Sequence, residues 1–118
     1  MGPSRISIPT LLLAGTIAGI WQPAGAAEPP TFTLKIENHH FSPEILEVPA
    51  GKRVLLLVTN ADRTPEEFES YQLNREKVIP GKTTGKVYVG PLDPGTYPFF
   101  GDFHQKTAQG RLVVKQAD

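Results

Sequence analysis

The 118-residue chain contains no cysteine. It therefore has no disulfide bond, no thiolate metal ligand and no cysteine that could carry the lipid of a lipoprotein. A net charge is also absent, because 12 basic residues balance 12 acidic ones. Such a balance provides no electrostatic attraction to nucleic acid or to an acidic membrane surface, so neither is expected as a partner. Stability must come from an ordinary apolar core, helped by any bound ligand.

Long hydrophobic runs are scarce, and the longest lies near the N-terminus. Ile6–Ile20 is mostly apolar, follows the basic Arg5 and precedes Ala24-Gly25-Ala26, which has the small-residue pattern of a signal-peptidase site. A membrane span needs about 20 apolar residues, and this run is shorter and interrupted by polar residues. We therefore predict a cleavable signal peptide over residues 1–27 and a periplasmic domain over residues 28–118, without membrane insertion after cleavage. An uncleaved anchor is the alternative.

Helical periodicity and enzyme motifs are also missing from residues 28–118. No Gly-rich phosphate loop and no Gly-x-Ser-x-Gly turn occurs, so hydrolase or transferase chemistry of those kinds is not expected. What the chain has instead is 12 prolines and 11 glycines, many of which separate short apolar runs. This spacing predicts one all-β domain with the architecture of a sandwich.

The apolar runs predict the individual strands. Phe32, Leu34 and Ile36 alternate with polar residues, which predicts a strand with one apolar face and one solvent-exposed face. Residues 53–59 are nearly all Val and Leu, which suits a strand buried on both faces. The remaining predicted strands are 45–48, 66–73, 76–79, 84–90, 96–102 and 110–115.

The order of these elements resembles that of a cupredoxin, most clearly in the C-terminal hairpin. In that family the hairpin reads Tyr-x-x-x-Cys-x-x-His-x-x-Met-x-Gly, and here it begins at Tyr97 and keeps His104. Gly101 stands at the Cys position. The stretch after His104 is one residue longer than in the family pattern, and Ala108, two residues before the closing Gly110, stands at the Met position. The run that matches the remaining His ligand is Glu66-Glu67-Phe68-Glu69-Ser70, with Glu66 at the His position. The resemblance implies a Greek-key β-sandwich in which three of the four ligands of type 1 copper are replaced.

Four runs narrow the resemblance: His39-His40-Phe41-Ser42-Pro43, Glu66-Glu67-Phe68-Glu69-Ser70, residues 75–81 and Phe99-Phe100-Gly101-Asp102-Phe103-His104. In these runs the chain resembles the small periplasmic cupredoxin-like component of bacterial ferrous-iron uptake systems. It is also similar to the cupredoxin-like domain attached to imelysin-type iron-uptake proteins. The resemblance implies binding of iron and/or copper, and assistance to ferrous oxidation before transport. It also implies partners such as a periplasmic iron-binding protein or an inner-membrane permease.

Histidines and carboxylates are the candidate metal ligands, because they are harder donors than thiolate and suit iron, manganese or copper(II). We expect Glu66 or Glu67 to lie opposite His104 at one end of the sandwich. The full set of candidates is His104, Glu66, Glu67, Asp102 and His40.

Strand geometry restricts this set, since adjacent residues on an extended chain point in opposite directions. At most one of His39 and His40 can therefore face a shared site, and Glu67 is expected to point away from both Glu66 and Glu69.

Simpler interpretations exist for all of these residues. His104 could cap the hairpin by hydrogen bonding, the two adjacent histidines could lie in a solvated loop, and the acidic run could form an exposed strand. Two other functions therefore stay open: a periplasmic protein of copper binding or trafficking, and a metal-free module that docks on a periplasmic partner.

Overall fold

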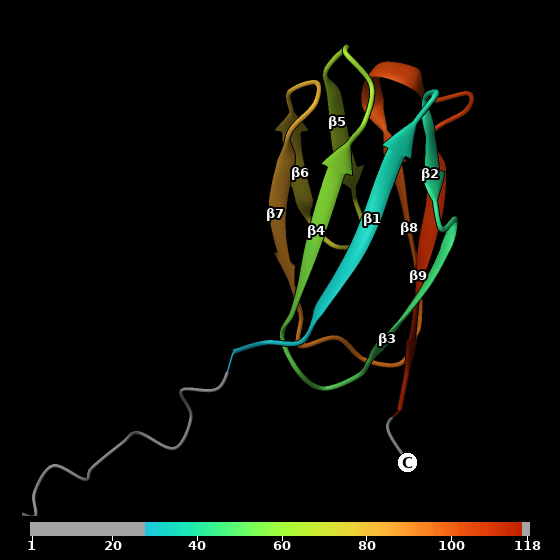
Figure 1. Cartoon of the computed structure of the whole chain (residues 1–118). Helices are drawn as coiled ribbons and strands as arrows, with labels where there is room; N and C mark the ends of the chain where they lie inside the picture. The colour runs from blue at the N-terminus through green and yellow to red at the C-terminus, as the bar shows by residue number, and fades with distance from the viewer. Residues whose placement is uncertain (1–27, 117–118) are drawn as a thin grey trace, which may run out of the picture.

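The computed structural model describes residues 28–116, which form two β-sheets packed face to face (Figure 1). The strand order is β2-β1-β4-β7 in one sheet and β3-β9-β8-β5-β6 in the other. The prediction of an all-β Greek-key sandwich in a single domain is confirmed. The bounds are β1 Thr31–Glu37, β2 His40–Ser42, β3 Ile45–Pro49, β4 Val54–Asn60, β5 Glu66–Ser70, β6 Arg75–Ile79, β7 Thr84–Val89, β8 Gly95–Gly101, the 3-10 turn η2 Asp102–His104, and β9 Gln109–Lys115.

Strand directions decide which loops lie together. β1 runs parallel to β4, and β3 runs parallel to β9, whereas the other paired strands are antiparallel. As a result, the connections that follow β1, β4, β6 and β8 gather at the same end of the sandwich, the upper end in Figure 1. The described chain begins and ends at the opposite end. Loops that are far apart in the sequence thus become neighbours.

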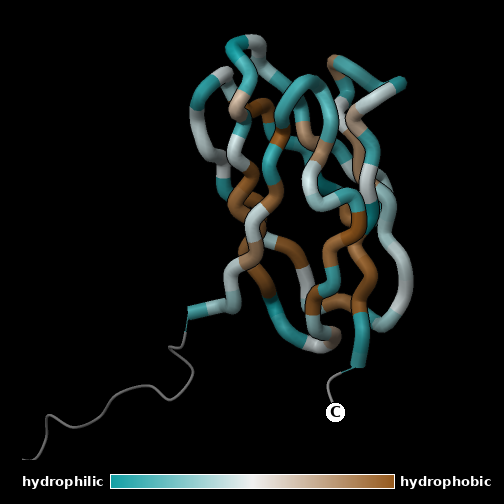
Figure 2. The backbone as a smooth tube through the Cα atoms, turned by 45° about the vertical axis from the view of Figure 1, so that its right-hand side comes forward, coloured by the Kyte–Doolittle hydropathy of each residue, from teal (hydrophilic) through white to brown (hydrophobic). Residues whose placement is uncertain are grey.

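The core lies between the two sheets and takes alternating residues from both. In the tube of Figure 2, hydrophobic segments run along the strands, and hydrophilic segments occupy many of the loops. Phe41, Phe68 and Phe99 are all buried, and the ring of Phe41 meets the other two edge to face. Burying a side chain of this size contributes about 1.5–3 kcal/mol. This aromatic cluster joins β2, β5 and β8 across the two sheets.

The prediction that residues 53–59 form a strand buried on both faces is only half right. In β4 the inward-facing Val54, Leu56 and Val58 are buried. On the outward face Leu55 is also buried, but Leu57 and Thr59 are only half-buried. The physical reason is that the sandwich has two layers, so the outer face of each sheet meets solvent.

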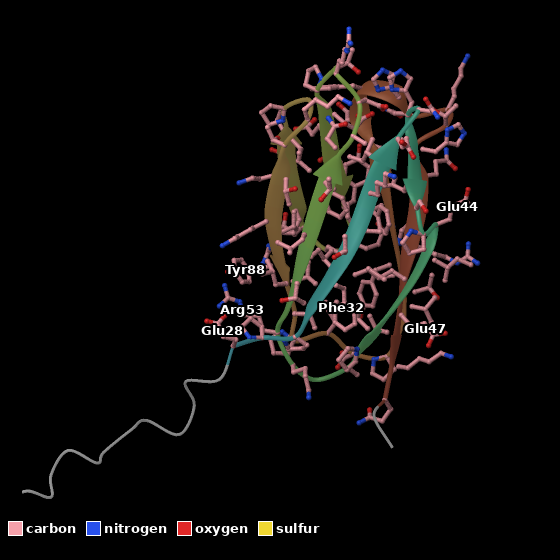
Figure 3. All side chains as sticks on the ribbon, viewed as in Figure 1. Glu28, Phe32, Glu44, Glu47, Arg53 and Tyr88 are labelled. Atoms are coloured by element: carbon pink, nitrogen blue, oxygen red, sulfur yellow. The ribbon has the colours of Figure 1, made fainter. Side chains whose placement is uncertain are left out.

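Near the lower end of this sheet, a cation lies over an aromatic ring on the outer face. The Cζ atom of Arg53 is 4.2 Å from the ring centroid of Tyr88 (Figure 3). An exposed pair of this kind contributes about 0.5–1 kcal/mol. It covers the apolar part of Tyr88 far from the upper loops.

One predicted strand is too long and one strand was not predicted, whereas the bounds of the other strands differ from the predictions by at most one residue. The predicted strand 66–73 ends at Ser70, whose hydroxyl accepts a hydrogen bond from the Leu73 amide and donates one to the Pro98 carbonyl. The short strand β2 is not among the predicted strands.

Residues 28–116 contain no helix long and apolar enough to cross a membrane. The predicted signal peptide, residues 1–27, lies outside the described part of the chain.

Candidate metal centre

Three of the elements at the upper end bring two imidazoles and one carboxylate together. His39 comes from the turn between β1 and β2, Glu66 is the first residue of β5, and His104 is the last residue of η2. One possible ligand atom from each lies within 4.8 Å of the other two. The two imidazole rings are stacked, with centroids 3.6 Å apart and planes inclined by 12°. We call this group the His39–Glu66–His104 cluster.

The carboxylate of Glu66 is the buried centre of the cluster, with a side chain only 1% exposed. Its Oε2 atom lies 2.5 Å from Nδ1 of His104. Its Oε1 atom accepts hydrogen bonds from the amides of Phe103 at 2.8 Å and Glu67 at 3.0 Å. A buried carboxylate is costly unless it is paired and hydrogen-bonded. These three contacts meet that requirement and hold the carboxylate beneath the loops.

Gly101 makes the room that this carboxylate occupies. A Cβ atom added to Gly101 would lie 2.6 Å from Cδ of Glu66, 2.9 Å from its Oε1 and 2.7 Å from Cβ of the buried Ala108. Real Cβ atoms do not approach heavy atoms so closely. Gly101 stands where the resemblance places a cysteine, so the carboxylate of Glu66 fills the space that a side chain at position 101 would need.

His39 is held in an unusual turn by the carboxylate of Asp62, in the loop between β4 and β5. Asn38 and His39 have positive φ angles of 54° and 59°. The Asn38 amide donates to Oδ1 of Asp62 at 2.8 Å, and the His39 amide donates to Oδ2 at 3.0 Å. Nδ1 of His39 lies 3.4 Å from the same Oδ2 atom.

The pKa of Asp62 reflects these contacts. Burial by itself would raise the pKa, but the amide hydrogen bonds from His39 and Asn38, helped by the nearby imidazoles, outweigh it and lower the pKa below its ordinary value. Sequence reasoning missed Asp62, because no motif marks a carboxylate that acts on a turn 23 residues away in the chain.

Of the predicted ligands, Glu66 and His104 lie together, as their assigned positions implied. The histidine that joins them is His39, whereas the predicted His40 is exposed at the start of β2 with its Nδ1 atom 2.7 Å from the Asn38 carbonyl oxygen. Asp102 begins η2, and its carboxylate accepts a hydrogen bond from the Gln105 side-chain amide. Metal ligation by any of these residues stays a prediction.

Glu67 lies on the opposite face of β5 from Glu66, as expected. The expectation that Glu69 faces the same way as Glu66 is wrong, because a strand repeats every two residues and places Glu69 beside Glu67. Both of these outward residues approach Glu76 of β6, with possible ligand atoms within 4.8 Å of one another. This second group contains carboxylates without imidazole.

Crowding in the outward acidic group has an electrostatic consequence. Desolvation is the largest cause of the raised pKa of Glu67, followed by the negative charges of Glu76 and Asp102. For Glu69, desolvation again comes first among the causes of a raised pKa, followed by hydrogen bonding to Glu76 and the charge of that residue. Like charges held close together favour the protonated form. Desolvation and the neighbouring negative charges therefore disfavour the ionised forms of Glu67 and Glu69.

The donor atoms of the His39–Glu66–His104 cluster do not fit type 1 copper, which needs a thiolate. They do fit a metal that accepts two imidazole nitrogens and one carboxylate oxygen. Non-haem iron(II) is bound by two histidines and one carboxylate in many proteins, and imidazole with oxygen donors also suits copper(II). The partly exposed rings of His39 and His104 leave a solvent-facing side on the cluster.

Comparisons with known proteins agree with the fold. A family model described as a cupredoxin-like domain matches residues 10–114. A protein of Rickettsia prowazekii (strain Madrid E), described as uncharacterized, is 47% identical over 81 residues, which are 69% of this chain. The match spans 65% of the Rickettsia protein, slightly less than two thirds of its length.

Solved structures are similar in fold at low sequence identity. Auracyanin A, described as a blue copper protein from Chloroflexus aurantiacus, has a TM-score of 0.64 at 20% identity, covering 75% of this chain and 100% of that one. The metal-binding domain of the Cu(I)-exporting P-type ATPase CopA of Streptococcus pneumoniae D39 has a TM-score of 0.65 at 14% identity, covering 73% of this chain and 85% of that one. Amicyanin from Paracoccus versutus has a TM-score of 0.59 at 14% identity, with coverage of 78% and 88%.

Proposed function

Because this chain belongs to the family of cupredoxin-like domains, we propose that it is an exported metal-binding protein that holds iron and/or copper outside a type 1 site. The observation that carries this proposal is the His39–Glu66–His104 cluster, with possible ligand atoms within 4.8 Å of one another at the loop end of the sandwich. The absence of cysteine from the sequence removes the strongest copper ligand of blue copper proteins.

Burial of Glu66 supports metal binding over a metal-free docking role. A carboxylate that is 1% exposed adds little to a docking surface, and its desolvation costs free energy that apolar packing would avoid. As one ligand of a cation, the same carboxylate supplies negative charge where it is least screened by water. Gly101 keeps the space for it open.

The role that we propose for the site is in ferrous-iron uptake in the periplasm, next to an iron-binding periplasmic protein or an inner-membrane permease. The sequence resemblance to the components of such uptake systems supports this role. A donor set with a carboxylate favours the higher oxidation state of iron over the lower one. Assistance to ferrous oxidation by an external one-electron acceptor is therefore a prediction, in which the donors stabilise the ferric product and the acceptor takes the electron.

Copper binding or trafficking is the second candidate function. Two of the similar structures favour it, because one is described as a blue copper protein and the other as a domain solved with Cu(I). The cluster offers nitrogen and oxygen donors, so we expect it to prefer Cu(II) to Cu(I).

The test is the affinity of the protein for Fe(II), Cu(II), Cu(I) and Mn(II), measured by competition with chelators of known affinity. We expect His104→Ala and Glu66→Gln each to weaken binding of the preferred metal at least about tenfold, because each removes one directed ligand. Glu67→Gln makes the same chemical change one residue along, on the outward face, and should leave affinity unchanged.

A second control is Lys86→Gln, on the exposed face of β7. If the wild-type protein binds none of the four metals, the proposal is wrong and the docking module takes its place. If it binds metal but His104→Ala and Glu66→Gln do not change the affinity, the metal site lies elsewhere.

A further inference from the structure

His39 reaches the cluster only because its turn adopts a conformation that most residues avoid. Asn38 and His39 both lie in the left-handed region, with φ angles of 54° and 59°. A residue other than glycine is strained in this region unless its surroundings hold it there. The turn therefore needs an external partner.

Asp62 is that partner. Its two carboxylate oxygens accept the two consecutive amides of the turn, from Asn38 at 2.8 Å and from His39 at 3.0 Å. The oxygen bonded to the His39 amide also lies 3.4 Å from Nδ1 of the His39 ring. One carboxylate thus contacts both the backbone and the ring of the same histidine.

Asp62 is itself firmly placed. Its amide donates to the side-chain oxygen of Asn60 at 3.0 Å, and its carbonyl accepts from the Lys82 amide at 2.9 Å. Asn60 is fully buried, and its side-chain amide donates to the carbonyls of Thr64 and Ile79. The carboxylate of Asp62 therefore stands on a rigid base rather than at the tip of a free loop.

We propose that Asp62 is a positioning residue that sets both the place and the tautomer of His39 for metal binding. The inference rests on the proposed function and adds a residue to it. Because Nδ1 lies within ion-pair distance of a carboxylate oxygen, at 3.4 Å, the hydrogen of the neutral ring is favoured on Nδ1, and the lone pair is left on Nε2 for a metal. Carboxylates that orient a ligating histidine in this way typically contribute about 10- to 100-fold to metal affinity.

Asp62→Ala is the informative change, because it removes both acceptor oxygens at once. Without a carboxylate beside Nδ1, we expect the hydrogen of the His39 ring to move to Nε2, the position that a free neutral histidine prefers in water. Nitrogen chemical shifts of the metal-free protein distinguish the two tautomers without any metal present. We also expect the affinity for Cu(II) or Fe(II) to fall at least about tenfold.

Asp62→Asn serves as a milder variant with nearly the same volume. Its side chain keeps one acceptor oxygen, so one of the two turn amides loses its partner and the negative charge is lost. We expect Asp62→Asn to lower the metal affinity by about threefold or more, which is a smaller loss than for Asp62→Ala. Should Asp62→Ala fail to fold, an unchanged affinity in Asp62→Asn would overturn the inference.

A double-mutant cycle with His39→Ala tests whether Asp62 acts through His39. We expect His39→Ala alone to lower the metal affinity at least as much as Asp62→Ala does. In the His39→Ala background, either change of Asp62 should have no further effect. Asp93→Ala removes an exposed aspartate at the opposite end of the sandwich and should alter neither the tautomer nor the affinity.

Two further results would overturn the inference. An equal loss of affinity from changing Asp62 with and without His39 would mean that Asp62 is a direct ligand or a general charge. An unchanged His39 tautomer in folded Asp62→Ala would mean that the carboxylate does not orient the ring. If the wild-type protein binds no metal, the proposed function fails, while the tautomer measurement still tests what Asp62 does to His39.

Discussion

Gly101→Ala tests most directly whether Glu66 occupies the space that a side chain at position 101 would need. The new Cβ atom would lie 2.6 Å from Cδ of Glu66 and 2.7 Å from Cβ of Ala108. Neither neighbour can move freely, because Ala108 is fully buried and the Glu66 carboxylate is held by three hydrogen bonds. The extra carbon must therefore displace at least one of them.

The cost follows from these two contacts. Overpacking a buried position by one carbon costs about 1–3 kcal/mol, and disturbing hydrogen bonds to a buried charged group costs about 1.5–3 kcal/mol. If both contacts are disturbed, we expect Gly101→Ala to reduce the free energy of unfolding by about 2.5–6 kcal/mol. For a domain of this size, this corresponds to a fall in melting temperature of at least about 10 °C. Urea unfolding followed by circular dichroism measures the difference.

A double-mutant cycle separates the two neighbours. In a Glu66→Ala background, the contact with Cδ is removed and the contact with Ala108 remains, so the cost of Gly101→Ala should fall by at least about 1 kcal/mol. Gly51→Ala is the control: its Cβ would meet nothing within 4 Å, so only the strain of its φ angle of 77° is added. A cost of Gly101→Ala below about 1 kcal/mol, or costs that add within about 0.5 kcal/mol in the cycle, would refute the idea that Glu66 fills this space.

Three further predictions concern the spectrum, the export and the outward acidic group. Loaded with Cu(II), the protein should show only weak ligand-field absorption, and an intense thiolate-to-copper band would contradict a site built without cysteine. Protein recovered from the cell envelope should begin at Ala27 or Glu28 by N-terminal sequencing, whereas an intact N-terminus in the membrane fraction would favour an anchor. Glu67→Gln should stabilise the protein at neutral pH, because the raised pKa of Glu67 means that its ionised form is disfavoured in the fold. The advantage of the variant should be lost as the pH falls through that raised pKa and below the ordinary glutamate value of about 4.3, which melting curves across acidic and neutral pH would show; an advantage that does not depend on pH would contradict this cause.

Much of the fold was predictable from the sequence. Alternation of apolar and polar residues, interrupted by proline and glycine, located most of the strands, because burial on one face of a sheet imposes a period of two. The resemblance to cupredoxins led to the prediction that His104 lies opposite Glu66 or Glu67. In the structure the partner is Glu66, with its Oε2 atom 2.5 Å from Nδ1 of His104. The absence of cysteine excluded type 1 copper without any coordinates.

Other features of the site depended on contacts between distant residues. The two-residue periodicity of a strand does not predict which of two adjacent histidines in a turn faces inward. Here the positive φ angles of Asn38 and His39 orient His39, rather than His40, toward His104. Those conformations are maintained by Asp62, which local sequence patterns do not connect to the turn.

The position of Glu66 also depends on a residue that is distant in the sequence. The absent side chain of Gly101 leaves room for the Glu66 carboxylate only because the pairing of β5 with β8 brings the two residues together. The sequence by itself thus determined the strands, the core and the types of donor atom, because these follow from the chemistry of residues near one another in the chain. Tertiary structure alone decided which donors meet, because loops from separate strands converge only when the two sheets have packed.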